Sequence, residues 1–242
     1  METNKNSNIH SNAFSIKSNI NSVILVCSAV LFTFIFGCRK SGSLTKLDVI
    51  DGGASINETP VKNDSCDLKT FTQGGWGASP HGNNPGVYLH KNFLAAFPSG
   101  LTVGCASKFT LTLTSAQAVT DFLPSGGPAA ALKASYKDPQ GFKNVFAAQL
   151  VALTLSVGFD NYDPAFAGSP LNLGNLTVKS GIFKGMKISA ILTEANNAFG
   201  GCNSNYSISD LVTILTAINE NFDNGTVNNG VLNCSSIGIV VG

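Results

Sequence analysis

The chain has 242 residues, of which 43% are hydrophobic and only 12% are charged, so it has enough apolar material for a core and is not a disordered protein. Its 15 basic and 14 acidic residues give a net charge of +1, without the clustered Lys and Arg that neutralise phosphates. This charge pattern argues against nucleic acid as a partner.

Residues 1–37 have the pattern of an export signal. A polar stretch with Lys5 and Lys17 precedes a mostly apolar run at 23–36, which as a helix would span about 21 Å. A bilayer core needs about 30 Å, so this run fits the core of a signal peptide better than a transmembrane helix. An uncleaved signal anchor is the alternative.

Residues 35–38, Ile-Phe-Gly-Cys, resemble the lipobox of bacterial lipoproteins. The resemblance implies cleavage after Gly37 and lipidation of the Cys38 thiol, which makes a membrane the expected partner. Arg39 stands where retention in the inner membrane typically places Asp, so the resemblance favours the outer membrane of the cell envelope. Several acyl chains on one cysteine would anchor the protein firmly. Residues 38–65, rich in Ser, Gly, Thr and Asn, are expected to form a flexible tether.

Four cysteines follow the tether: Cys66, Cys105, Cys202 and Cys234. An even number in an exported chain indicates two disulfides, for which three pairings exist. Cys66 and Cys234 bracket the domain, and chain ends commonly lie close together, so the preferred pairing is Cys66–Cys234 with Cys105–Cys202. A zinc site is the alternative, but there is no Cys-x-x-Cys spacing and only two histidines follow the signal. No metal or other cofactor is expected.

Residues 66–242 are expected to form the extracytoplasmic domain. Short helices are predicted at 87–97, 114–123 and 129–136. A long helix is predicted from Asp138, as N-cap, to near Gly158. That helix is apolar on nearly every face, which places it in the centre of the domain.

Two further helices are predicted near the end of the chain. One covers 185–199 and is closed by Gly200-Gly201, and the other begins with Ser207 as N-cap and Asp210 at N3. Alternating apolar residues at 109–113 and 173–178 indicate two short strands, for which mutual pairing is one arrangement. The expected fold class is mainly α: a single compact, disulfide-braced helical domain with a small two-stranded β element.

The most unusual stretch is 70–83, which holds the only tryptophan, Trp76, among four glycines. A tryptophan on a glycine-rich loop can stack on a sugar, so Trp76 and the nearby His81 are candidate ligand-binding residues. The favoured alternative is a tryptophan that fills the edge of the core beneath its own loop.

Several segments together resemble a bacterial cell-surface module that typically opens with Thr-Gln-Gly-Tyr-Trp-Lys-Asn-His-Pro. The resemblance would cover residues 66–234, and the module brings no assigned activity. The opening differs here, since Gly75 stands where an aromatic residue precedes the tryptophan. The segments that carry the resemblance are 70–81, 111–117, 174–178, 195–201, 219–225 and Cys234.

No Gly-x-Ser-x-Gly, His-Glu-x-x-His or P-loop motif is present. Asp160 and Asp163 could form a carboxylate pair or hold calcium, but turn chemistry explains them more simply. We therefore expect a lipid-anchored envelope or cell-surface protein, not an enzyme, with a non-enzymatic binding or structural role toward an envelope protein or a glycan. The alternative is a carbohydrate-active or other hydrolytic envelope protein that uses Trp76, His81, Asp160 and Asp163.

Overall fold

The computed structural model describes residues 66–234, and its central element is helix α4 (Val145–Tyr162). Leu150, Leu153 and Phe159 of this helix are fully buried, as its apolar sequence predicted. Among residues 66–234, no helix combines the length and the apolar character that crossing a membrane requires. The predicted signal peptide (1–37), the lipidated Cys38 and the tether (38–65) lie outside the described residues.

Both predicted ends of this central helix were wrong. Asp138 has a φ of 44° and uses its carboxylate to accept hydrogen bonds from Thr114, and residues 138–143 form an irregular, bent segment instead of a first helical turn. Asn144 is the N-cap, because its side-chain oxygen accepts from the backbone N–H groups of residues 146 and 147. At the other end, Gly158 does not stop the helix. The Phe97 ring packs where a side chain at residue 158 would project.

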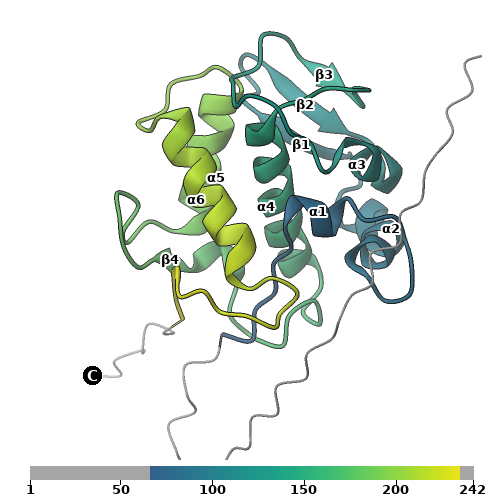
Figure 1. Ribbon diagram of the computed structural model, residues 1–242, viewed down its shortest axis with the longest axis vertical. Helices are drawn as coiled ribbons and strands as arrows, with labels where there is room; N and C mark the ends of the chain where they lie inside the picture. The colour runs from purple at the N-terminus through teal and green to yellow at the C-terminus, as the bar shows by residue number, and fades with distance from the viewer. Residues whose placement is uncertain (1–65, 235–242) are drawn as a thin grey trace, which may run out of the picture. The chain divides into compact units, whose positions relative to one another are not determined.

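In Figure 1, α5 and α6 lie on one side of α4, and α1, α2 and α3 lie on the other. Helix α6 makes the most extensive packing against α4, and α5, α1 and α2 also contact it. The predicted cap of α6 is confirmed, since the Ser207 hydroxyl oxygen accepts from the backbone N–H of Asp210. The helices are α1 (Gln73–Trp76), α2 (Pro85–Ala96), α3 (Ala116–Phe122), α5 (Ile188–Phe199) and α6 (Ile208–Asn221), with a 3₁₀ turn at Leu173–Asn175.

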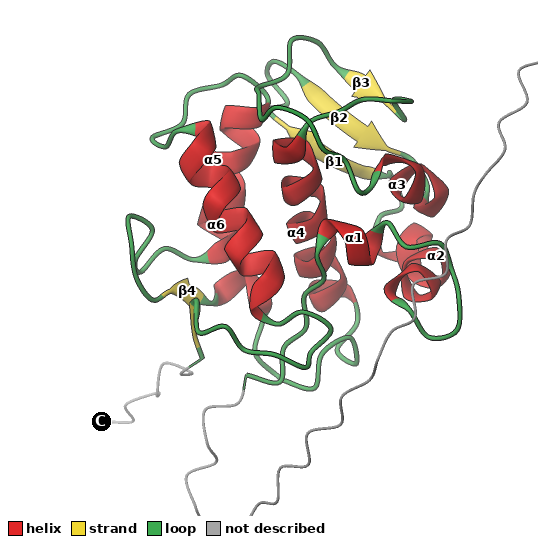
Figure 2. Cartoon of the chain, in the orientation of Figure 1, coloured by secondary structure: helices red, strands yellow, loops and turns green. Residues whose placement is uncertain are grey.

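The strands form two small sheets, which Figure 2 distinguishes from the helices by colour. Strand β1 (Leu101–Gly104) pairs antiparallel with β2 (Thr110–Leu113), and β2 pairs in parallel with β3 (Tyr136–Lys137). Strand β4 (Thr177–Val178) pairs antiparallel with β5 (Leu232–Asn233).

Two sequence expectations about these regions were wrong. The segments 109–113 and 173–178 do not pair with each other, because each finds a partner that the alternation pattern did not reveal. The helix predicted at 129–136 is absent from this described segment. There the backbone N–H of Leu132 donates to the carbonyl of Phe199, and the segment ends in β3. The described part of the chain is thus a compact α/β domain with 41% helix and 10% strand, richer in strand than predicted.

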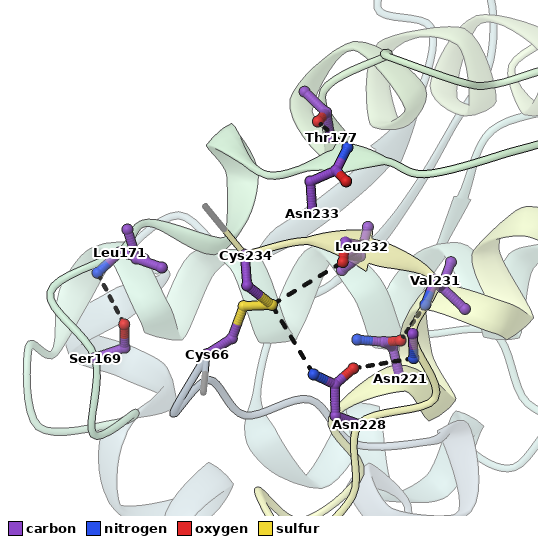
Figure 3. The surroundings of a disulfide bond; sticks show 11 residues. Cys66, Ser169, Leu171, Thr177, Asn221, Asn228, Val231, Leu232, Asn233 and Cys234 are labelled. Atoms are coloured by element: carbon purple, nitrogen blue, oxygen red, sulfur yellow. Dashed lines mark hydrogen bonds between the residues drawn. A yellow bond between two sulfur atoms is a disulfide. The ribbon is translucent and has the colours of Figure 1, made fainter. Parts of the chain in front are cut away.

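Both predicted disulfides are present. Cys66–Cys234 joins the two ends of the described chain, with Cα atoms 5.4 Å apart. Cys105–Cys202 links the end of β1 to the turn after α5, with Cα atoms 6.2 Å apart. Figure 3 shows Cys66 and Cys234 beside β5, with Ser169 and Leu171 of a nearby loop in the same view. The ends of the domain are therefore fixed to each other covalently.

Candidate functional site

Trp76 lies in the core and offers no surface to a ligand, since its side chain is 0% exposed. Its indole N–H donates to the hydroxyl of Ser156 on α4 over 3.2 Å. Its ring stacks on Phe166, with centroids 6.1 Å apart, and meets the edge of Phe71 at 4.9 Å. The interpretation in which the tryptophan fills the core beneath its own segment matches this geometry.

The glycines around Trp76 allow backbone segments to approach each other closely. A Cβ atom at Gly77 would lie 2.3 Å from the carbonyl oxygen of Leu123, and one at Gly86 would lie 2.0 Å from that of Ala78. No larger residue fits at these positions without moving the backbone. The glycine-rich composition of 70–86 therefore has a packing explanation at these two sites.

His81 is exposed and lies in the turn that leads into α2. Its backbone N–H donates to the side-chain oxygen of Asn84, the N-cap of that helix. Asn84 also accepts from the backbone N–H of Val87 and donates its amide to the carbonyl of Ser79. The side chain of Asn84 therefore holds the turn around His81 through these hydrogen bonds.

The loop 163–172, which connects α4 to the 3₁₀ turn, lies between two hollows. Phe166 and Ala167 fix it to the core, with exposures of 3% and 6%. The larger hollow has a volume of about 490 Å³. It is lined by Asp160, Pro164, Ala167, Gly168, Ser169, Pro170, Leu171 and Asn172.

Asp160 is the one charged side chain among the residues that line the larger hollow. Its Oδ2 atom accepts a hydrogen bond of 2.7 Å from the backbone N–H of Leu173. Burial raises the pKa of this carboxyl, and the hydrogen bond from Leu173 opposes the rise only in part. The side chain of Asn172, another residue of this lining, donates to that of Asn161. These contacts fix the end of the loop against the last turns of α4.

Asp163 contributes to a different region, although it is only three residues further along the chain. Its Oδ2 atom accepts a hydrogen bond of 2.7 Å from the hydroxyl of Tyr88, and its Oδ1 atom accepts from the backbone N–H of Ala165. Burial, then the bond to Asp163, raises the pKa of Tyr88 well above its usual range. Asp160 and Asp163 are therefore engaged by different protein groups and do not act as one carboxylate pair here.

The smaller hollow, on the Tyr88 side of the loop, has a volume of about 180 Å³. Sequence reasoning did not select it, because its residues come from four separate segments of the chain. Its floor is aromatic and its rim carries amides and one ammonium group. It is lined by Lys69, Phe71, Asn83, Asn84, Pro85, Tyr88, Ala165, Phe166 and Asn224.

Neither hollow includes Trp76 or His81 in its lining. Within residues 66–234, no group of three His, Cys, Asp or Glu side chains is placed to hold a metal ion. The residues predicted for a shared site are therefore distributed among the core, an exposed turn and the two sides of one loop. Trp76 is related to the smaller hollow only indirectly, because Phe71 and Phe166 of its lining contact the indole ring.

Comparisons of the chain with family models, with curated proteins and with solved structures gave no match. The site is accordingly interpreted from its own geometry, and the resemblance of residues 66–234 to a cell-surface module stays a proposal.

Proposed function

We propose that this chain is a lipid-anchored protein of the bacterial cell envelope, attached through Cys38, whose disulfide-braced domain has a non-enzymatic binding or structural role. The observation that carries the proposal is the pair of disulfides, Cys66–Cys234 and Cys105–Cys202. Disulfides persist in oxidising compartments, and an exported chain enters one. They therefore support the location that the lipobox-like sequence before Cys38 implies.

The position of Cys66–Cys234 fits a tethered domain. Cys66 directly follows the segment 38–65 that we expect to act as tether, and its partner is 168 residues further along the chain. A force transmitted through the tether would act on the domain at this disulfide. The first and last segments of the domain are joined there, so neither could detach from the core alone. This arrangement suits a protein that contacts its partner while held to a membrane.

Mass spectrometry of the protein purified from membranes tests the anchor and the disulfides together. We expect a mature chain that begins at Cys38, carries the added mass of acyl groups, and gains the hydrogens of two opened disulfides on reduction. A Cys38→Ser variant should leave the membrane fraction and take up no labelled palmitate. Cys27→Ser, within the predicted signal peptide, is the matched control and should behave like the parent. Palmitate labelling that persists in Cys38→Ser would refute the proposal.

One observation favours a hydrolytic alternative. Asp160 is a half-buried carboxyl with a raised pKa in the larger hollow, and general acids have these properties. The alternative predicts release of reducing ends from envelope polysaccharides by the parent and loss of that release in Asp160→Asn. Equal activity of the parent and Asp160→Asn would contradict the hydrolytic alternative.

A further inference from the structure

The smaller hollow joins parts of the chain that are far apart in sequence. Lys69 and Phe71 come from the start of the domain, Tyr88 from α2, Phe166 from the loop 163–172, and Asn224 from the turn after α6. Backbone bonds connect the first and last of these parts, since Thr70 donates its N–H to the carbonyl of Phe222 over 3.0 Å. The hollow therefore lies where the start and the end of the domain are hydrogen-bonded to each other.

Three polar groups of the lining are free to form hydrogen bonds with a ligand. The amides of Asn83 and Asn224 and the ammonium of Lys69 form no side-chain hydrogen bond or ion pair within residues 66–234. Asn84 differs, because its side-chain oxygen accepts two hydrogen bonds and its side-chain nitrogen donates one, to Ser79. The ammonium of Lys69 lies 5.7 Å from the centroid of the Phe166 ring. Donors and acceptors for a ligand are thus available at the rim.

The Tyr88 side chain and the backbone of Asn224 are held in place before any ligand arrives. The Tyr88 hydroxyl donates to Asp163, and the Tyr88 ring packs against Phe159 and Phe166 with centroids 5.1 and 5.2 Å away. Asn224 has a φ of 56° and its backbone N–H donates to the carbonyl of Thr70. Groups fixed in this way lose little freedom when a ligand binds.

The chemistry of this lining matches a sugar better than other small ligands. Each amide can donate and accept, as a sugar hydroxyl does, whereas a phosphate would find only one cation and a metal ion would find no free carboxylate. The partly exposed Tyr88 ring, beside the more deeply buried Phe166, gives an apolar surface for the C–H face of a pyranose. A wholly apolar ligand would bury the Lys69 ammonium without a partner.

We propose that the hollow between Lys69, Tyr88, Phe166 and Asn224 binds one saccharide residue of an envelope glycan. This inference rests on the proposed function, because it names the class of partner that the anchored domain would contact. Lys69 and the amides of Asn83 and Asn224 donate to ring hydroxyls, and the hydroxyl of Tyr88 accepts from one while it donates to Asp163. Trp76 supports the site only from below, through Phe71 and Phe166.

An array of immobilised neutral and uronic-acid-containing oligosaccharides tests the proposal with the full-length chain in detergent. We expect retention on at least one glycan, with Kd then measured by calorimetry using that oligosaccharide. Lys69→Ala should weaken binding about 10-fold, as loss of a charged hydrogen bond does. Asn83→Ala and Asn224→Gly should each weaken it about 5-fold, and glycine tolerates the backbone conformation at 224.

Lys91→Ala and Asn203→Ala are the matched controls, since both residues are exposed and lie outside the hollow. They should leave Kd unchanged. No retained glycan, or binding that survives Lys69→Ala and Asn83→Ala unchanged, would overturn the saccharide site. Neither result would bear on Cys38, because lipidation is measured separately. Conversely, the anchor would be refuted and the site retained if the mature protein isolated from cells carried no acyl groups but still bound sugar through Lys69.

Discussion

The segment 70–86 and the loop 163–172 look alike in sequence, since both place an aromatic residue among glycine, proline and small polar residues. Both aromatic side chains are buried, but their surroundings differ. In the first, Trp76 is fully enclosed and the glycines allow close backbone contacts. In the second, Phe166 is enclosed while hollows open on both sides of the loop. An aromatic residue in a glycine-rich segment therefore says little about binding until its packing partners are known.

The largest expected effect concerns Trp76. Replacement by alanine removes a fully buried ring that contacts Phe71, Phe159 and Phe166, so we expect the free energy of unfolding to fall by about 4 kcal/mol. Urea denaturation measures this change. Trp76→Phe should cost less than half as much, because most of the apolar contact remains. A loss below about 1 kcal/mol for the alanine variant would contradict burial of the ring.

A smaller effect is expected at Gly86. A methyl group there would lie 2.0 Å from the carbonyl oxygen of Ala78, so Gly86→Ala forces the two segments apart and should destabilise the protein by about 2 to 3 kcal/mol. Gly126→Ala is the control, because a methyl group at that site meets nothing within 4 Å. Equal stability of the two variants in thermal unfolding would show that the turn before α2 is looser than described.

Tyr88→Phe probes the contact between α2 and the loop 163–172. The variant keeps the ring but leaves Asp163 without the hydroxyl donor, which should lower the free energy of unfolding by about 1 kcal/mol. Amide hydrogen exchange should become faster within 163–172. Tyr162→Phe is the control, because that side chain is 45% exposed. Unchanged exchange in the Tyr88 variant would mean that the bond to Asp163 does not hold the loop.

The smallest effect is a pH dependence from Asp160. Burial raises its pKa, so the folded protein binds this proton more tightly than the unfolded chain. Stability should therefore decline as pH rises above 3.8, the ordinary value for Asp, and the decline should stop once the carboxyl is ionised in both states. Asp160→Asn should remove this contribution and can still accept from Leu173. The measurement is urea denaturation at several pH values. If the free energy of unfolding changed with pH in the same way for the parent and for Asp160→Asn, the prediction would be wrong.

Some of the fold could be predicted because its causes are local. The cap formed by Ser207 and Asp210 lies within one helical turn, and the all-round apolar sequence of 145–157 was enough to place α4 in the core. The disulfide pairing was predicted from the cysteines that bracket the domain, and the structure confirms it. The function of Cys38 remains a prediction, since it lies outside the described residues.

The sequence by itself determined the main helices, the cap at Ser207, the end of α5 at Gly200 and the covalent closure of the domain, because neighbouring residues or cysteine positions specify these features. Only the tertiary structure decided that Asp160 and Asp163 are engaged by different groups, the backbone of Leu173 and the hydroxyl of Tyr88, and that Gly158 stays inside a helix. The physical reason is that each outcome depends on a distant partner: Tyr88, 75 residues before Asp163, supplies its hydrogen bond, and the Phe97 ring takes the space beside Gly158. No periodicity in the chain encodes such contacts.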